Sequence, residues 1–219
     1  MPLFLTEDGS HSFLSDEFGV LYHSAHGAIQ ETQHIFIKAG LHHVLSQGLT
    51  QIAILDMGFG TGLNALMTYL ETENLGIHIR YVAYEKYPLS IEQAMELNFS
   101  KILNVQRSEH FVMHLCDWEI RHPFNPYFSL EKRLAAFEDI DIHDEFNLIY
   151  FDAFAPEIQP ELWEEPIMQK MYNALKVNGV LTTYCAKGAF KRTLKNLGFA
   201  VEGLPGPPHK REITRATKL

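Results

Sequence analysis

A chain of 219 residues is long enough for one large domain with a complete hydrophobic core. Its hydrophobic content of 46% is ordinary for a globular protein, and no apolar run approaches the length of a membrane span. The net charge of −9 argues against a generally basic nucleic-acid-binding protein. The two cysteines form no disulfide framework and the N-terminus lacks a signal-peptide pattern, so we expect a cytoplasmic protein with free thiols and no membrane attachment.

The charges are distributed unevenly along the chain. Residues 186–219 contain eight Lys and Arg but two acids, a net charge of +6, whereas residues 1–185 carry a net charge of −15. Such asymmetry is typical of proteins that bind a polyanion, but a solvated basic face without a partner explains it equally well. The candidate contacts to a polyanion are Lys187, Lys191, Arg192, Lys210 and Arg211.

The first 50 residues precede the most informative motif. Residues 3–6 and 12–14 are predicted to be short strands around a turn at 7–10. Apolar spacing predicts a helix over 31–47, although Gly40 weakens this prediction. We expect this lead-in either to cap the sheet or to form one wall of a substrate pocket.

Residues 52–70 are predicted to form a strand, a glycine-rich turn and a helix. The apolar strand ends at Asp56, and the turn has the pattern D-x-G-x-G-x-G instead of the G-x-G-x-x-G of dinucleotide-binding folds. A carboxylate at this position repels a pyrophosphate but attracts a ligand with an amino group and a positively charged sulfur. The pattern therefore favours S-adenosylmethionine over an ordinary glycine turn. Its candidate contacts are Asp56, Gly58, Gly60 and Gly62.

A second strand is predicted over 77–84 and ends at Glu85. An acid at the tip of the second strand of a βαβ unit accepts hydrogen bonds from ribose hydroxyls. Glu85 follows Gly62 by 23 residues, close to the spacing that such a unit requires. Glu85 is therefore the candidate ribose ligand, with a surface glutamate as the alternative.

The next predicted helix, over 108–117, places histidines on one face. His110, His114 and Asp117 share that face, with Cys116 nearby. This is not the H-E-x-x-H spacing, and no fourth ligand is suitably placed, so we expect no metal site.

The region that follows carries a weaker pattern. Residues 121–128 contain two prolines and are expected to be a loop, and 134–137 are expected to be the third strand. Asp139 beyond this strand is the candidate acceptor of a hydrogen bond from the adenine amino group. The alternative is that Glu138 and Asp139 form a solvated acidic pair.

The strongest strand pattern is FNLIYF, from Phe146 to Phe151, which is typical of a central buried strand. It ends at Asp152, where α/β proteins place catalytic groups. The remaining predicted elements are a helix over 161–175 ended by Asn178-Gly179, a strand over 180–185, a basic helix over 190–197 and two strands over 200–204 and 212–217.

Six segments resemble the MnmC-type tRNA methyltransferase family. They are GAIQETQHIFIKAGL (27–41), DMGFGTGLNAL (56–66), EKYPL (85–89), YFDAFAPEIQPELW (150–163), LTTYCAKGAFKRTLKNLGF (181–199) and GPPHKREI (206–213). The resemblance covers nearly the whole chain, and DAFAP and KRE are more specific than the glycine motif. It implies a single α/β domain over 1–219 of the Rossmann-like class I methyltransferase type, with a lead-in or cap over 1–50 and a core over 51–219. The expected sheet has seven mostly parallel strands, an antiparallel last strand and helices on both faces.

The resemblance also implies an activity. Proteins of this family methylate 5-aminomethyl-2-thiouridine at the tRNA wobble position to the 5-methylaminomethyl form, with S-adenosylmethionine as the donor. The partner implied here is tRNA, bound by the basic residues named above, and Glu31, Phe154 and Pro156 are candidate substrate contacts. Larger members carry a flavin-dependent oxidoreductase domain. This chain resembles the stand-alone form, whose substrate is made by other enzymes.

Asp152 is the candidate catalytic residue, because the acceptor amine must lose a proton in the reaction. An ordinary Asp pKa of about 3.9 makes a poor base for an alkylamine. We therefore expect Asp152 to orient the amine and accept its proton late, in a dry pocket. A contact to the amino group of the donor is its alternative role.

Three other functions remain open from the sequence. A small-molecule N-methyltransferase or an aminopropyltransferase fits DAFAP and the basic segment less well than a tRNA enzyme does. A non-catalytic S-adenosylmethionine-binding module is disfavoured by Asp56, Glu85 and Asp152. A nicotinamide-dependent oxidoreductase is disfavoured by Asp56 and the glycine spacing.

Overall fold

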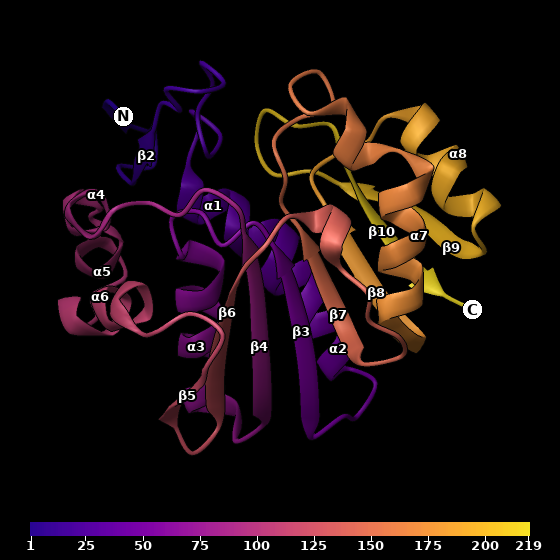
Figure 1. Cartoon of the computed structure of the whole chain (residues 1–219), viewed down its shortest axis with the longest axis horizontal. Helices are drawn as coiled ribbons and strands as arrows, with labels where there is room; N and C mark the ends of the chain where they lie inside the picture. The colour runs from indigo at the N-terminus through magenta and orange to yellow at the C-terminus, as the bar shows by residue number, and fades with distance from the viewer.

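A mixed β-sheet forms the centre of the molecule (Figure 1). The computed structural model describes residues 1–219, except for the side chains of residues 73 and 74. Across this described chain, eight strands form the sheet in the order β5-β6-β4-β3-β7-β8-β10-β9. They are β3 (Gln51–Met57), β4 (His78–Glu85), β5 (Arg121–Asn125), β6 (Phe128–Leu134), β7 (Phe146–Phe151), β8 (Leu175–Thr183), β9 (Phe199–Pro205) and β10 (Glu212–Lys218).

The five strands from β6 to β8 in this order run parallel, whereas β5 and β10 run antiparallel to their neighbours. This is the predicted Rossmann-like arrangement with one strand more than the expected seven. Helices cover both faces of the sheet, and therefore both faces of each central strand are apolar. In β3, Ile52 and Ile54 pack into one layer, and Leu55 and Met57 pack into the other.

Two helical groups make these layers. The first group is α1 (Ala28–Thr32), the π-helix η1 (Gln33–His42), α2 (His43–Leu45), α3 (Leu63–Leu75), α4 (Ile91–Glu96), α5 (Phe99–Ile102) and α6 (Arg107–Leu115). The second is the 3₁₀-helices η2 (Phe137–Asp139) and η3 (Pro160–Trp163), with α7 (Glu165–Ala174) and α8 (Gly188–Asn196). Figure 1 shows α4 to α6 beside one edge of the sheet and α7 and α8 at the other. None of the helices in the described part of the chain is long and apolar enough to cross a bilayer.

The predicted N-terminal strands are present as the hairpin β1 (Leu3–Leu5) and β2 (His11–Phe13). The predicted lead-in helix is present too, but it begins at Ala28 and its middle portion is a π-helix. Gly40 does not interrupt it. A Cβ atom there would lie 3.1 Å from the Thr182 hydroxyl and 3.3 Å from the Tyr150 ring, so glycine allows the helix to pack closely on the sheet.

The third parallel strand was predicted too late in the chain. Residues 121–128, expected to be a loop, contain edge strand β5, and β6 ends where the predicted strand begins. Pro123 is tolerated because β5 pairs on one side only. The apolar alternation of β6 is interrupted by Lys132, which is nevertheless fully buried, and this charge concealed the strand.

The boundary between α7 and β8 also differs from the prediction. The helix ends at Ala174, and Asn178-Gly179 lies within β8 instead of ending a helix. Asn178 has a φ of 63°, and the pairing register between β7 and β8 shifts beside it. These residues therefore form a bulge in the strand.

Candidate active site

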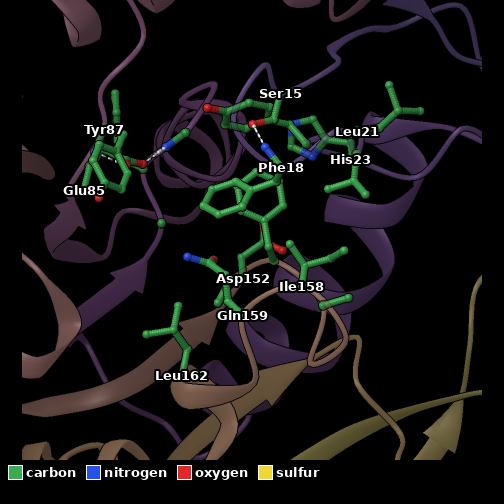
Figure 2. A pocket seen from close by; sticks show the side chains of 18 of the residues that line it. Ser15, Phe18, Leu21, His23, Glu85, Tyr87, Asp152, Ile158, Gln159 and Leu162 are labelled. Atoms are coloured by element: carbon green, nitrogen blue, oxygen red, sulfur yellow. Dashed lines mark hydrogen bonds between the residues drawn. The ribbon is translucent and has the colours of Figure 1, made fainter.

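A cavity of about 510 Å³ lies at the carboxyl ends of β3, β4 and β7. Figure 2 shows Glu85 and Tyr87 on one side of it and Asp152 on another, with Phe18 and His23 from the N-terminal lead-in facing them. The rest of the wall comes from the glycine turn, η2, the loop after β7 and the C-terminal hairpin. Segments from the whole length of the chain therefore meet at this cavity.

The glycine turn packs directly against the end of β7. Gly58 has a φ of 112° and Gly60 a φ of 48°, both in the region that favours glycine. A Cβ atom on Gly58 would lie 3.2 Å from the backbone carbonyl oxygen of Asp152. Glycine here therefore brings the turn close to the residue predicted to be catalytic.

Glu85 is fixed at the wall of the cavity by two backbone groups. Its Oε2 accepts a hydrogen bond from the Gly60 N–H (2.9 Å), and its Oε1 accepts one from the Tyr87 N–H (2.8 Å). An ionised carboxylate can accept about four hydrogen bonds. Glu85 thus retains acceptor capacity for a diol in the cavity.

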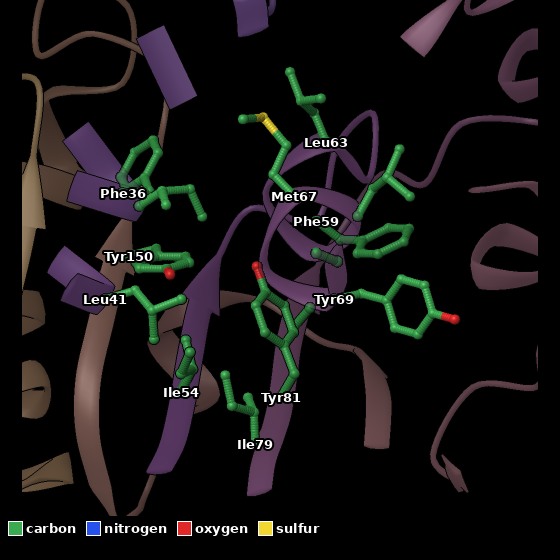
Figure 3. Packing of buried hydrophobic residues seen from close by; sticks show 14 of the residues in the cluster. Phe36, Leu41, Ile54, Phe59, Leu63, Met67, Tyr69, Ile79, Tyr81 and Tyr150 are labelled. Atoms are coloured by element: carbon green, nitrogen blue, oxygen red, sulfur yellow. The ribbon is translucent and has the colours of Figure 1, made fainter. Parts of the chain in front are cut away.

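Asp56 does not contact the cavity, contrary to the sequence-based prediction of a direct donor contact. It is fully buried, and its Oδ2 accepts a hydrogen bond from the Tyr81 hydroxyl (2.6 Å). Figure 3 shows Tyr81 and Tyr150 packed among apolar side chains between the sheet and α3. Burial raises the pKa of Asp56 to about 7. This carboxyl therefore links the end of β3 to Tyr81 on β4.

Asp152 lines the cavity immediately after β7. Its Oδ2 accepts a hydrogen bond from the Asn64 amide (3.0 Å), whose oxygen accepts one from the Thr32 hydroxyl (3.0 Å). Burial and the nearby carboxylates of Glu31 and Asp56 raise the pKa of Asp152 well above its ordinary value. Asp152 is therefore a stronger base than its residue type suggested.

Glu31 and Lys210 form an ion pair beside Asp152 in the wall of the cavity. The Lys210 ammonium lies 2.8 Å from Glu31 Oε1 and 4.5 Å from the centre of the Tyr184 ring. The other oxygen of Glu31 accepts a hydrogen bond from the Ser24 N–H (3.1 Å). The C-terminal hairpin and α1 thereby close one side of the site.

An aromatic cluster lines the cavity between the lead-in and the loop after β7. The Phe154 ring centroid lies 5.0 Å from that of Phe18 and 5.2 Å from that of Tyr22. Phe154 therefore contributes an apolar wall, as predicted. Pro156 was paired with it in the prediction but does not line the cavity.

Two further residues that were predicted to contact S-adenosylmethionine, Asp139 and Gly62, also lie outside the cavity lining. Asp139 is exposed in η2, and its neighbour Glu138 lines the cavity instead. The shift of the third strand toward the N-terminus causes this displacement. Gly62 is the N-cap residue that precedes α3, and His114 packs beside the position that its Cβ would occupy.

The histidines on α6, which were expected to bind no metal, contact the glycine turn. His110 and His114 both point Nε2 at the Thr61 carbonyl oxygen, whereas Asp117 is exposed. Both imidazole rings therefore contact the backbone of the glycine turn.

The basic C-terminal segment is largely neutralised by acids of the same chain. Lys187 pairs with Glu157, and Lys191 lies 2.7 Å from Glu212. Arg215 and Lys218 are also paired, with Glu202 and Asp144. Among the described side chains of this segment, the exposed cations outside these pairs are Arg192, Lys195 and Arg211.

Several lining residues were missed from the sequence. Asn64 is a polar residue in the otherwise apolar first turn of α3, which was a usable signal. Phe18, Tyr22 and His23 lie in the irregular lead-in and reach the cavity through long-range packing. No periodic pattern marks such positions.

The residues of the cavity fit S-adenosylmethionine. The glycine turn lets a ligand approach its backbone, and Glu85 offers acceptors for a ribose. Phe137 and Leu162 supply apolar wall on the side of η2 and η3 for an adenine ring. Carboxylates near the turn suit a ligand with an ammonium and a sulfonium group.

Residues 130–219 match the family described as S-adenosyl-L-methionine-dependent methyltransferase. Among solved structures, MnmC2 from Aquifex aeolicus has a similar fold and superposes with a TM-score of 0.77 and 23% identity. This match covers 98% of the chain and 68% of that structure. Spermidine synthase from Thermotoga maritima superposes with a TM-score of 0.57 at 17% identity, covering 96% of the chain and 69% of that structure.

Among curated proteins, the chain is similar to tRNA 5-methylaminomethyl-2-thiouridine biosynthesis bifunctional proteins MnmC. It is 28% identical to the protein of Leptospira interrogans, with 91% of this chain and 33% of that protein covered. For the protein of Leptospira borgpetersenii the identity is 30%, covering 91% of this chain and 32% of that protein. The chain thus spans about a third of the length of these relatives.

We expect the Asp56→Asn variant to lose a pH dependence of stability. The native state holds a proton on Asp56 more tightly than the unfolded chain does, so this group destabilises the protein as pH rises from about 4 to about 7. In this range the free energy of unfolding falls by up to about 1.4 kcal/mol per pH unit. The stability of the variant relative to wild type should therefore rise between pH 5 and pH 7, measured by urea unfolding. Parallel pH curves would contradict the assignment, and Asp139→Asn is the exposed control.

Glu85→Ala should weaken binding of S-adenosylhomocysteine by about thirtyfold, because it removes charge-assisted acceptors and releases the Gly60 N–H. Isothermal titration calorimetry measures the affinity. Asp139→Ala is the matched control, since this acid lies outside the cavity lining and should leave the affinity unchanged. Equal losses in the two variants would refute the role of Glu85.

Proposed function

We propose that the methyltransferase methylates the aminomethyl nitrogen of 5-aminomethyl-2-thiouridine at the tRNA wobble position, giving 5-methylaminomethyl-2-thiouridine. The observation that carries this proposal is the acidic wall of the cavity, where Asp152, Asn64 and Glu31 lie beside the glycine turn. Relatives named for the biosynthesis of this nucleoside align with 91% of the chain, which supports the same substrate.

Charge favours an amine as the acceptor. Glu31 is already neutralised by Lys210, whereas Asp152 contacts the uncharged Asn64 amide. Keeping Asp152 ionised in this environment is costly, as its raised pKa shows. A cationic amine offsets that cost, because an opposite charge nearby favours the ionised carboxylate. A hydroxyl or carboxylate acceptor does not provide this compensation.

The side chains then have separate tasks in the transfer. Bound S-adenosylmethionine supplies an activated methyl group on a positively charged sulfur. Asp152 orients the acceptor nitrogen and takes its proton, and its raised pKa brings it closer to the pKa of an amine. Asn64 holds the carboxylate in place. Phe18, Tyr22 and Phe154 exclude water from this side of the cavity.

We assign tRNA binding to the exposed cations that lie outside the ion pairs described above. Arg192 and Lys195 lie on α8, and Arg211 follows Lys210, which lines the cavity. Paired lysines must first break an ion pair to reach a phosphate. Of the five cations predicted from the sequence to contact tRNA, this argument keeps Arg192 and Arg211. It adds Lys195 as a further contact. The wobble base would enter the cavity flipped out of its stack, among the aromatic rings.

The test uses purified protein with tRNA carrying 5-aminomethyl-2-thiouridine and S-adenosylmethionine. Nucleoside mass spectrometry should show conversion to the 5-methylaminomethyl form. Asp152→Asn should lower turnover by about a hundredfold or more, because a positioned proton acceptor is lost. Its affinity for S-adenosylhomocysteine should change little, which separates proton transfer from donor binding.

An unchanged mass of the 5-aminomethyl-2-thiouridine nucleoside would refute the proposed acceptor, even if the protein binds S-adenosylmethionine. Methylation of free amines but not of tRNA would shift the assignment to a small-molecule enzyme. Full turnover in Asp152→Asn would show that Asp152 is not the partner of the amine.

Replacing Arg192, Lys195 and Arg211 with Gln should weaken tRNA binding and reduce its salt dependence. Each phosphate contact contributes about 0.7 to 0.9 to the slope of log affinity against log salt, so loss of all three reduces the slope by about two to three. Filter binding across a salt series measures both quantities. The matched control is Lys187→Gln with Lys191→Gln, which removes cations held in ion pairs. An equal effect in both sets would contradict the division into free and paired cations.

A further inference from the structure

Histidines from two separate parts of the chain contact Thr61, the residue between Gly60 and Gly62. His110 and His114 lie one turn apart on α6, and their Nε2 atoms are 2.7 and 3.0 Å from the Thr61 carbonyl oxygen. His23 of the lead-in places its Nε2 2.7 Å from the Thr61 hydroxyl. The chemistry of methyl transfer assigned above uses none of these contacts.

The direction of the two bonds from α6 is fixed by chemistry. A carbonyl oxygen only accepts, so both imidazoles donate an N–H from Nε2. Burial lowers the pKa of His110, and that of His114 to about 3, which keeps both rings neutral. Neither ring lines the cavity. The Thr61 carbonyl is therefore held on the side of the turn that faces α6.

This restraint acts on the Thr61–Gly62 peptide, whose N–H also donates a hydrogen bond to the Phe59 carbonyl oxygen (2.8 Å). Gly60 and Gly62, on either side of Thr61, have φ values of 48° and 72° and tolerate many backbone conformations. Rotation of the peptide between Thr61 and Gly62 would turn its carbonyl toward the cavity. A donor that carries a carboxylate binds best where backbone N–H groups face it, and a carbonyl oxygen repels it.

The packing around the two histidines holds them against the Thr61 carbonyl. A Cβ atom on Gly62 would lie 2.9 Å from His114 Nε2, so the glycine makes room for this ring. Lys132, fully buried on β6, donates a hydrogen bond to the His114 carbonyl oxygen (2.7 Å). The Lys132 ammonium also lies 4.7 Å from the centre of the Trp118 ring. The end of α6 is thereby fixed against the sheet.

We propose that His110 and His114 are positioning residues for the donor site, which hold the Thr61 peptide in the orientation that accepts S-adenosylmethionine. This inference concerns the donor alone and does not depend on the identity of the acceptor.

The test compares two double variants by calorimetry with S-adenosylhomocysteine. His110→Phe with His114→Phe keeps two rings but removes both donors, and should weaken binding by about tenfold or more. His110→Gln with His114→Gln loses the rings but keeps an N–H donor near the Nε2 position, and should retain affinity within about threefold. In turnover assays the Phe variant should raise the KM for the donor and leave kcat at saturating donor unchanged.

His143→Phe, at an exposed site, is the control and should bind as wild type does. Wild-type affinity in the Phe double variant would overturn the proposal. The proposal would also be overturned if the Phe double variant bound S-adenosylhomocysteine strongly and the Gln double variant bound it weakly. That result would show that the two rings act through packing alone. Melting temperatures of all variants show whether folding is retained. If a double variant does not fold, the single variants at His114 carry the same comparison.

Discussion

The approach of the Gly58 backbone to the Asp152 carbonyl oxygen determines the geometry of the whole site. A Cβ atom would fit poorly there, at 3.2 Å, so glycine lets the turn after β3 lie close to the end of β7. The cavity lies between the turn after β3 and the loop after β7. The contact between these two segments therefore sets the spacing of its walls, and alignment of bound groups is most of what a transfer reaction requires of a protein.

Burying several carboxylates near this contact costs free energy, and each carboxylate is stabilised by different partners. Asp56 is buried, and its carboxylate accepts a hydrogen bond from the Tyr81 hydroxyl. Glu31 has a lysine and a backbone N–H. Asp152 faces the cavity and accepts a hydrogen bond from one neutral amide, that of Asn64. A buried carboxylate with a neutral partner attracts a cation to one defined position, which provides selectivity as well as affinity.

The sequence predicted well what depends on local pattern. β3 and β7 are apolar on both faces, and Gly58, Glu85 and Asp152 were placed because they follow strand ends. β6 was missed since its buried Lys132 interrupts the apolar pattern. Asp56 was misplaced because strand side chains alternate, and it shares the inward face of Ile52 and Ile54. Phe18, His23 and Lys210 reach the cavity through packing between distant segments, which no local pattern records.

The ion pair between Glu31 and Lys210 joins residues that are 179 positions apart in the sequence. Close by, His34 contacts the Pro205 carbonyl oxygen across 171 positions. Contacts of such long range form late, because the intervening chain must first be ordered. The wall of the cavity that contains Lys210 is thus completed only when the last hairpin docks on the N-terminal helix. During synthesis on the ribosome, a chain that has already formed its glycine turn still has an open cavity, and the cavity closes on this side only once the C-terminal strands have emerged and folded.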